Sequence, residues 1–169
     1  YPEIARVGEN LSRPGIVHRL DNDTSGVMVI ARTQKMFNHL KRQFKERHVK
    51  KEYNALAHGV IPQDHFILDF KIARGGDGRM VARPRSNVLS LKTIRSVQDG
   101  REAITECWVE DRFSHTTLLR VEPHTGRTNQ IRVHLFAYND PIVGDTLYTQ
   151  KKYIRTVVEK SVGRLFLVS

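Results

Sequence analysis

The sequence predicts an α+β domain in which helices flank a mixed, mainly antiparallel sheet. Three strand-like stretches, at residues 88–97, 103–109 and 116–121, follow one another through short turns, which is typical of an antiparallel meander. Residues 34–47 carry apolar side chains at helical spacing. With 169 residues, 39% hydrophobic, and no visible repeat or linker, the chain fits a single domain over residues 1–169.

The first third of the chain should contain two short strands and a helix. Residues 16–20 and 27–31 are apolar, and the intervening 21–26 have the composition of a turn. Thr33 can cap the helix at 34–47. The predicted buried stripe of this helix consists of Met36, Phe37, Leu40 and Phe44.

The remaining elements follow from similar patterns. Residues 51–60 alternate in polarity and predict a strand, and three glycines make 74–79 a flexible loop. A helix is expected at 129–138, after a loop in which Thr128 can serve as the cap.

Positive charge is concentrated in two segments of the chain, whose formal net charge is +10. Residues 32–51 contain eight Lys or Arg and one acidic residue, and residues 71–95 contain seven and one. A single run of this kind is usually a solvated surface, but two runs on a basic background favour a polyanion ligand such as RNA. The candidate RNA-binding residues in these runs are Lys41, Arg42, Lys45, Arg47, Arg79, Arg83 and Arg85.

Composition also excludes several classes of protein. One cysteine, Cys107, rules out an intrachain disulfide framework and fits a reducing cytoplasm. No apolar run approaches the ~20 residues of a membrane-spanning helix.

The segment HRLDNDTSG, residues 18–26, is the first that contains candidate catalytic residues. On a strand, Arg19 and Asp21 would share a face, and a guanidinium beside a carboxylate keeps the carboxylate ionised. A positioned aspartate is a candidate nucleophile, although a structural ion pair closing the turn gives the same pattern. Asp23 fits an Asx turn better than a catalytic role.

The second such segment is TGRTNQIRVHL, residues 125–135. Gly126 permits an unusual backbone conformation, and Arg127 and Arg132 lie on either side of the helix start. Taken alone, the pattern also fits a capped amphipathic helix with arginines in solvent.

These two segments, with KEYNAL between them and PIVGDTLY after them, closely resemble the signature motifs of the RluA-type pseudouridine synthases. The resemblance runs in order from Pro14 to about Leu167, and it is most similar to the branch that modifies large-subunit ribosomal RNA. It implies that the chain has the pseudouridine synthase catalytic fold and that the enzyme isomerises uridine in RNA without metal or cofactor.

The resemblance also implies roles for single residues. Asp21 matches the family's essential aspartate, Tyr53 the tyrosine that packs on uracil, and Arg132 the basic residue that pairs with the aspartate. Arg19 matches the arginine that fills the gap left by the flipped uridine, and flipping is expected because a stacked base hides its glycosidic bond. The predicted catalytic residues are therefore Asp21, Tyr53 and Arg132, and Arg19 and Arg127 join the predicted RNA-binding residues.

Of the departures from the family pattern, two bear on the predicted site and domain. Asn129 stands where the family usually has histidine, and we expect a retuned pocket because an amide still donates and accepts hydrogen bonds. The family's first strand, with its Asn-Lys-Pro-type motif, is absent, so the catalytic domain is expected to be N-terminally incomplete.

Two other functions compete with the isomerase hypothesis. A non-catalytic RNA-binding module would explain the basic segments alone. A metal-dependent nuclease would need Asp21, Asp23 and Asp145 to converge on one ion, which their spacing does not ensure. The partner expected in the leading interpretation is RNA, either ribosomal or transfer RNA. No membrane partner is expected, and a monomer is the favoured oligomeric state.

Overall fold

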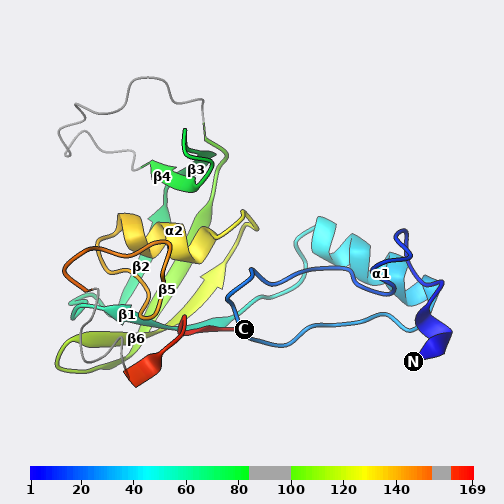
Figure 1. Ribbon diagram of the computed structural model, residues 1–169, viewed down its shortest axis with the longest axis horizontal. Helices are drawn as coiled ribbons and strands as arrows, with labels where there is room; N and C mark the ends of the chain where they lie inside the picture. Colours follow the sequence, from blue (N-terminus) through cyan, green and yellow to red (C-terminus); the bar gives the residue numbers. More distant parts are fainter. Residues whose placement is uncertain (84–99, 154–160) are drawn as a thin grey trace. The chain divides into compact units, whose positions relative to one another are not determined.

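The computed structural model describes residues 1–83, 100–153 and 161–169, which form two compact units. One unit contains residues 1–50 together with Ser169, and the other contains residues 51–168 (Figure 1). The single-domain assignment remains a prediction, and each unit is described here by itself.

A five-stranded antiparallel sheet forms the framework of the unit at 51–168, in the order β2-β5-β6-β1-β7. The antiparallel pairing confirms the predicted fold class. The bounds of its strands are β1 Tyr53–His58, β2 His65–Asp69, β5 Ile104–Arg112, β6 Thr116–Pro123 and β7 Leu167–Val168.

Strands β5 and β6 confirm two predicted strands and extend both. Cys107 pairs with Val121 in the register, and a bulge lies between Val109 and Asp111. The predicted strand ends at Val109, before the polar residues 110–112. Pairing with β6 carries the strand on to Arg112, since cross-strand contacts outweigh weak local preference.

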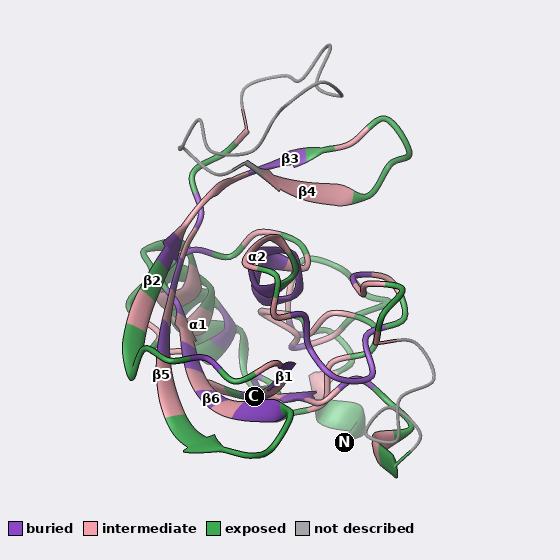
Figure 2. Cartoon of the chain, turned by 90° about the vertical axis from the view of Figure 1, so that its left-hand side faces the viewer, coloured by how far each residue is buried: buried purple, intermediate pink, exposed green. Residues whose placement is uncertain are grey.

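Helix α2, Gln130–Ala137, packs against this sheet (Figure 2). Ile131 and Leu135 join Leu119 and Val121 in the main hydrophobic core. All residues from Gln130 to Leu135 are buried, so polar members of the helix also lie inside the unit. The predicted helix is thus confirmed, but as a core helix and not as an amphipathic surface helix.

The predicted cap of α2 is wrong. Asn129, not Thr128, occupies the N-cap position, with a left-handed backbone (φ 54°) and no side-chain cap bond. Instead, the side chain of Gln130 accepts a hydrogen bond from the backbone N–H of Arg127 (3.0 Å). The buried amide of Gln130 thus satisfies a donor of the loop before the helix.

A two-stranded hairpin, β3 (Lys71–Arg74) and β4 (Met80–Arg83), encloses the predicted glycine loop. Gly78 has φ 82°, and the N–H of Gly75 donates to the carbonyl of Arg79 (2.6 Å). Strand β4 contacts α2. The strand predicted at 88–97 lies outside the described residues.

The unit at 1–50 is built on helix α1, Gln34–Lys45. Thr33 caps it as predicted, since its hydroxyl accepts from the N–H of Met36 (3.2 Å). Phe37 is buried against Val7 and Ala31, whereas Met36 is 47% exposed. Met36 was expected in the buried stripe, but one residue along a helix turns the side chain by about 100°. A short 3-10 helix, Pro2–Ile4, precedes this core.

The two strands predicted at 16–20 and 27–31 are not continuous strands. A single antiparallel bridge joins Ile16 to Ile30, and the N–H of Ala31 donates to the carbonyl of Gly15 (2.9 Å). Farther along, the N–H of Val29 donates to the ring Nε2 of His18 (3.0 Å) and not to a backbone carbonyl. A side chain thus replaces a ladder partner, and regular pairing stops. None of the helices in the described parts of the chain has the length and hydropathy to span a bilayer.

Candidate active site

Arg132 lies in the first turn of α2 with only 3% of its side chain exposed. It forms a bidentate ion pair with Asp145, whose side chain is fully buried. The Nε atom donates to Oδ2 (2.7 Å) and Nη2 donates to Oδ1 (2.9 Å). This planar pairing fixes both the position and the orientation of the guanidinium.

Backbone donors hold Asp145 from the other side. Its Oδ1 accepts hydrogen bonds from the N–H groups of Leu147 and Tyr148, both at 2.8 Å. The preceding Gly144 has φ 78°, and a Cβ there would lie 1.7 Å from the carbonyl oxygen of Arg164. Only glycine fits, so the Gly-Asp pair of PIVGDTLY has a structural reason.

Asn129 and Tyr148 complete the surroundings of the guanidinium. Asn129 accepts from Nη1 of Arg132 (3.3 Å), and its own amide points to the Tyr148 hydroxyl at 3.5 Å. The ring of Tyr148 faces the guanidinium, with its centroid 5.3 Å from Cζ. The amide at the position of the family's usual histidine therefore contacts the arginine directly.

The loop before α2 is held by a buried amide. Gln130 donates to the carbonyl of Ile104 and to the hydroxyl of Thr105, both at 2.9 Å. The hydroxyl of Thr125 donates to Gln130 (2.6 Å) and accepts from the N–H of Ile104 (3.0 Å). These bonds attach the TGRTNQ loop to β5, so the start of α2 has a defined position.

Tyr53 begins β1 opposite Val121 of β6 and is half-buried against the main core. Its Cα position is therefore set by the same sheet that supports α2. Asp21 belongs to the other unit, where it is half-buried and its carbonyl accepts from the N–H of Thr24 (3.1 Å), closing the predicted turn. Asp21 thus belongs to a different unit from Tyr53 and Arg132.

His18 supports the segment that leads to Asp21. Its ring stacks on Phe44 of α1, with centroids 4.6 Å apart and planes 16° apart. Burial lowers the pKa of His18, so the ring stays neutral and its Nε2 can accept from Val29. Arg19, next in the chain, is exposed.

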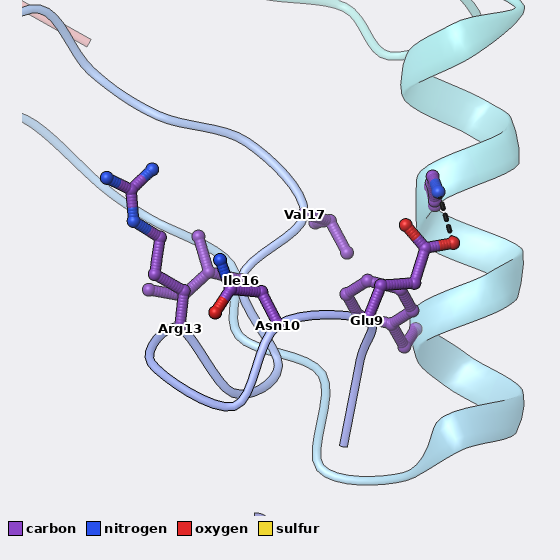
Figure 3. A pocket seen from close by; sticks show the side chains of 7 residues that line it. Glu9, Asn10, Arg13, Ile16 and Val17 are labelled. Atoms are coloured by element: carbon purple, nitrogen blue, oxygen red, sulfur yellow. Dashed lines mark hydrogen bonds and ion pairs between the residues drawn. The ribbon is translucent and has the colours of Figure 1, made fainter. Parts of the chain in front are cut away.

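The predicted RNA-binding residues differ in their partners. On α1, Lys41 pairs with Glu9, and Arg42 and Lys45 are exposed. Glu9 and Lys41 are among the residues that line a pocket of about 250 Å³, together with the apolar side chains of Ile16, Val17 and Phe37. Figure 3 shows this pocket with Glu9, Ile16 and Val17 labelled.

The other predicted RNA-binding residues lie in loops or beyond the end of α1. Arg47, two residues past α1, is exposed. Arg79 lies near Asp77 of its own loop (3.6 Å), and half-buried Arg127 donates from Nε to the carbonyl of Glu102 (3.0 Å). The side chains of Arg83 and Arg85 lie outside the described residues.

The nuclease hypothesis loses one of its three carboxylates. It requires Asp145 as a metal ligand, but this carboxylate is buried against a guanidinium, which would repel a cation. Among the residues that the structure describes, no group of three His, Cys, Asp or Glu side chains is arranged to hold a metal ion.

Sequence reasoning missed the structural partners of Arg132. The sequence offers Asp145 only as a metal ligand and indicates no role for Tyr148. It also indicates no role for Gln130, which holds the loop before α2. A local signal existed for Asp145, because an aspartate in a turn often accepts from the backbone N–H two residues on. Nothing in the spacing indicated that Arg132 would be its partner.

Comparison with known proteins identifies the family. The model of the RNA pseudouridylate synthase family matches residues 3–137. An uncharacterized RNA pseudouridine synthase of Aquifex aeolicus is 42% identical over 148 residues, which cover 86% of this chain and 43% of that protein. The ribosomal large subunit pseudouridine synthase C of Buchnera aphidicola is 38% identical, covering 90% and 45%.

Solved structures agree with these relatives. The human RNA pseudouridylate synthase domain containing 1 superposes with a TM-score of 0.76 at 27% identity, covering 90% of this chain and 60% of that one. The chain spans less than half the length of the two curated relatives described above. The match over residues 3–137 includes the segments HRLDNDTSG, KEYNAL and TGRTNQIRVHL and confirms their resemblance: the chain belongs to the RNA pseudouridylate synthase family.

Proposed function

We propose that this protein converts uridine to pseudouridine within RNA. The observation that carries the proposal is the buried, rigidly held guanidinium of Arg132 in a chain of this family. A buried ion pair adds little to stability compared with well-packed apolar residues. The place of Arg132 in the first turn of α2 is better explained by a chemical role at a second carboxylate.

Asp21 is proposed as that carboxylate. It acts on the sugar or the base while the bond from C1′ to N1 breaks, and the uracil then turns so that C1′ bonds to C5. The proton on C5 is released and N1 regains one, so the isomerisation needs no oxidant and no second substrate. Tyr53 packs on the uracil and is the candidate for moving this proton.

Arg132 is proposed to keep Asp21 ionised. The edge formed by Nε and Nη2 is taken by Asp145, so Asp21 has to meet other N–H bonds of the guanidinium. A guanidinium carries five N–H bonds and can therefore hold a second carboxylate. A cation beside Asp21 lowers its pKa and keeps it charged at neutral pH.

The substrate we propose is large-subunit ribosomal RNA, with transfer RNA as the alternative. Support comes from the net charge of +10, the exposed cations of α1, and the name of the Buchnera relative. Phosphate contacts position an RNA, and Arg19 fills the space of the flipped uridine. We also propose that the protein acts in the cytoplasm.

The deciding experiment maps pseudouridines in ribosomal and transfer RNA from cells with and without the gene. Loss of one or a few defined sites, restored by the wild-type gene, is the expected result. An unchanged map, together with tight RNA binding by the purified gene product, would favour the non-catalytic RNA-binding module. Tritium release from RNA labelled at uracil C5 tests turnover directly, and it should persist in chelator.

A further inference from the structure

The environment of Asp145 is more constrained than an ordinary ion pair requires. Its two oxygens receive four hydrogen bonds, two from Arg132 and two from backbone N–H groups. The backbone donors belong to a loop whose path depends on Gly144. The backbone bonds thus fix the carboxylate independently of the arginine. The position of the carboxylate therefore determines that of the guanidinium, and not the reverse.

We propose that Asp145 is the positioning residue of Arg132, and that it sets the orientation in which the guanidinium meets the reacting centre. This inference rests on the proposed function. Asp145 contacts neither RNA nor Asp21 in this role, and it acts only through the arginine.

The geometry explains why a positioning residue is needed here. Arginine has a long, flexible side chain, and a single weak acceptor such as Asn129 at 3.3 Å does not fix its plane. Bidentate pairing fixes the plane and also directs the opposite edge of the guanidinium. A misplacement of about 1 Å can reduce turnover by ~100-fold.

The first test compares Asp145→Asn with Asp64→Asn in the full-length gene product. An asparagine whose oxygen takes the place of Oδ1 still accepts from the N–H groups of Leu147 and Tyr148, but its NH₂ group replaces Oδ2 and faces the Nε–H donor of Arg132. We expect turnover at saturating RNA to fall by about 100-fold, with less than a threefold change in RNA affinity. Asp64 pairs with Arg112 through its Oδ1 (2.6 Å) on the surface and serves as the matched control, with unchanged turnover.

A nuclear magnetic resonance measurement reports on the pairing independently of activity. The Nε–H of Arg132 should exchange slowly with water in the wild type and rapidly in Asp145→Asn. If the gene product makes no pseudouridine, the proposed function fails while this measurement still decides the pairing.

A second test avoids leaving an unpaired guanidinium in the interior. Arg132→Ala opens a site beside Asp145 that free guanidinium ion can fill, and we expect millimolar guanidinium to restore turnover at least tenfold. The double variant Arg132→Ala/Asp145→Asn buries no unpaired charge at this site. Guanidinium should not restore its turnover, because the carboxylate that would hold the ion is absent.

Three results would overturn the proposal. One is a folded Asp145→Asn protein with turnover within threefold of wild type. Another is equal rescue of the single and double variants by guanidinium. The third is a turnover loss that vanishes once the active-site concentration is corrected for the folded fraction, because it would reduce Asp145 to a stabilising residue.

Discussion

The hydroxyl of Tyr148 accepts a hydrogen bond from the backbone N–H of Met80 (3.2 Å), which attaches the basic hairpin β3–β4 to the loop that holds Asp145. The same tyrosine places its ring against the guanidinium of Arg132. One side chain therefore contacts both the proposed RNA-binding hairpin and the proposed catalytic arginine.

Tyr148→Phe should loosen the hairpin and keep the ring contact with Arg132. The variant loses the bond from Met80 and the longer contact with Asn129 (3.5 Å). The bond from Met80 is worth about 1 kcal/mol, so RNA affinity should weaken about fivefold, while turnover at saturation should change less than twofold because the bidentate pair with Asp145 still holds Arg132. Faster hydrogen exchange at the Met80 amide would report the local change. Tyr138→Phe, whose hydroxyl contacts Gln63 at 3.3 Å, is the matched control and should leave both measurements alone.

Asp21→Asn should abolish turnover without unfolding the protein. The amide keeps the shape of the carboxylate but cannot act as an ionised nucleophile or base. Tritium release from C5-labelled RNA measures the effect, and RNA affinity should remain near the wild-type value. Residual activity within about tenfold of wild type, roughly 1.4 kcal/mol, would remove Asp21 from the mechanism.

The two neighbouring cations on α1 should differ in their contribution to RNA binding. Lys41 has to give up Glu9 before it can bind a phosphate, whereas Arg42 is exposed. In plots of log affinity against log salt, Arg42→Gln should flatten the slope by about one unit. Lys41→Gln should flatten it by less than half as much. Slopes equal to wild type for both variants would assign α1 to the solvated surface.

Local patterns were sufficient for much of the fold. The alternation around Ala55 and Ala57 predicted β1, and Thr33 followed by a helical stripe predicted α1, because neighbours in sequence decide both features. The predictions failed where a contact between residues far apart in the sequence determines the local structure. Val29 donates to His18 instead of a backbone carbonyl, so a ladder expected from two apolar runs does not form.

The same distinction holds at the candidate site. Motifs were enough to single out Asp21, Tyr53 and Arg132, since these residues carry the resemblance to the family. The bidentate partner of Arg132 lies thirteen residues away, across a loop whose path only the folded chain defines. Spacing alone cannot show that Asp145 turns inward, and so its role had to come from the structure.

Glu106, on the sheet surface, predicts an acid-dependent stability. Hydrogen bonds from His124 and His65, each 2.8 Å long, lower the pKa of Glu106. A carboxylate with a depressed folded-state pKa stabilises the fold above its ordinary pKa, and this contribution is lost as pH falls through the folded-state value. Glu106→Gln should therefore lower the free energy of unfolding by about 1 kcal/mol at pH 6–7. Denaturant titrations should show that the difference from wild type disappears in strong acid, whereas a constant difference would contradict the assignment.

His18 should make the segment before Asp21 sensitive to mild acid. Because burial lowers its pKa, the unfolded segment binds a proton more readily than the folded one. The contribution of His18 is therefore complete above its ordinary pKa of about 6.5 and is lost as pH falls below that value. Protonation also removes the Nε2 lone pair that accepts from the N–H of Val29.

Hydrogen exchange at single amides can measure this loss. After correction for the intrinsic rate, protection of the Val29 amide should fall between pH 7.5 and 5.5. The Ala31 amide, which donates to the carbonyl of Gly15, should change much less. His18→Gln should remove the pH dependence at Val29, and His39→Gln, on the exposed side of α1, should retain it. Equal protection of Val29 at both pH values in the wild type would show that the neutral imidazole is not what holds this segment.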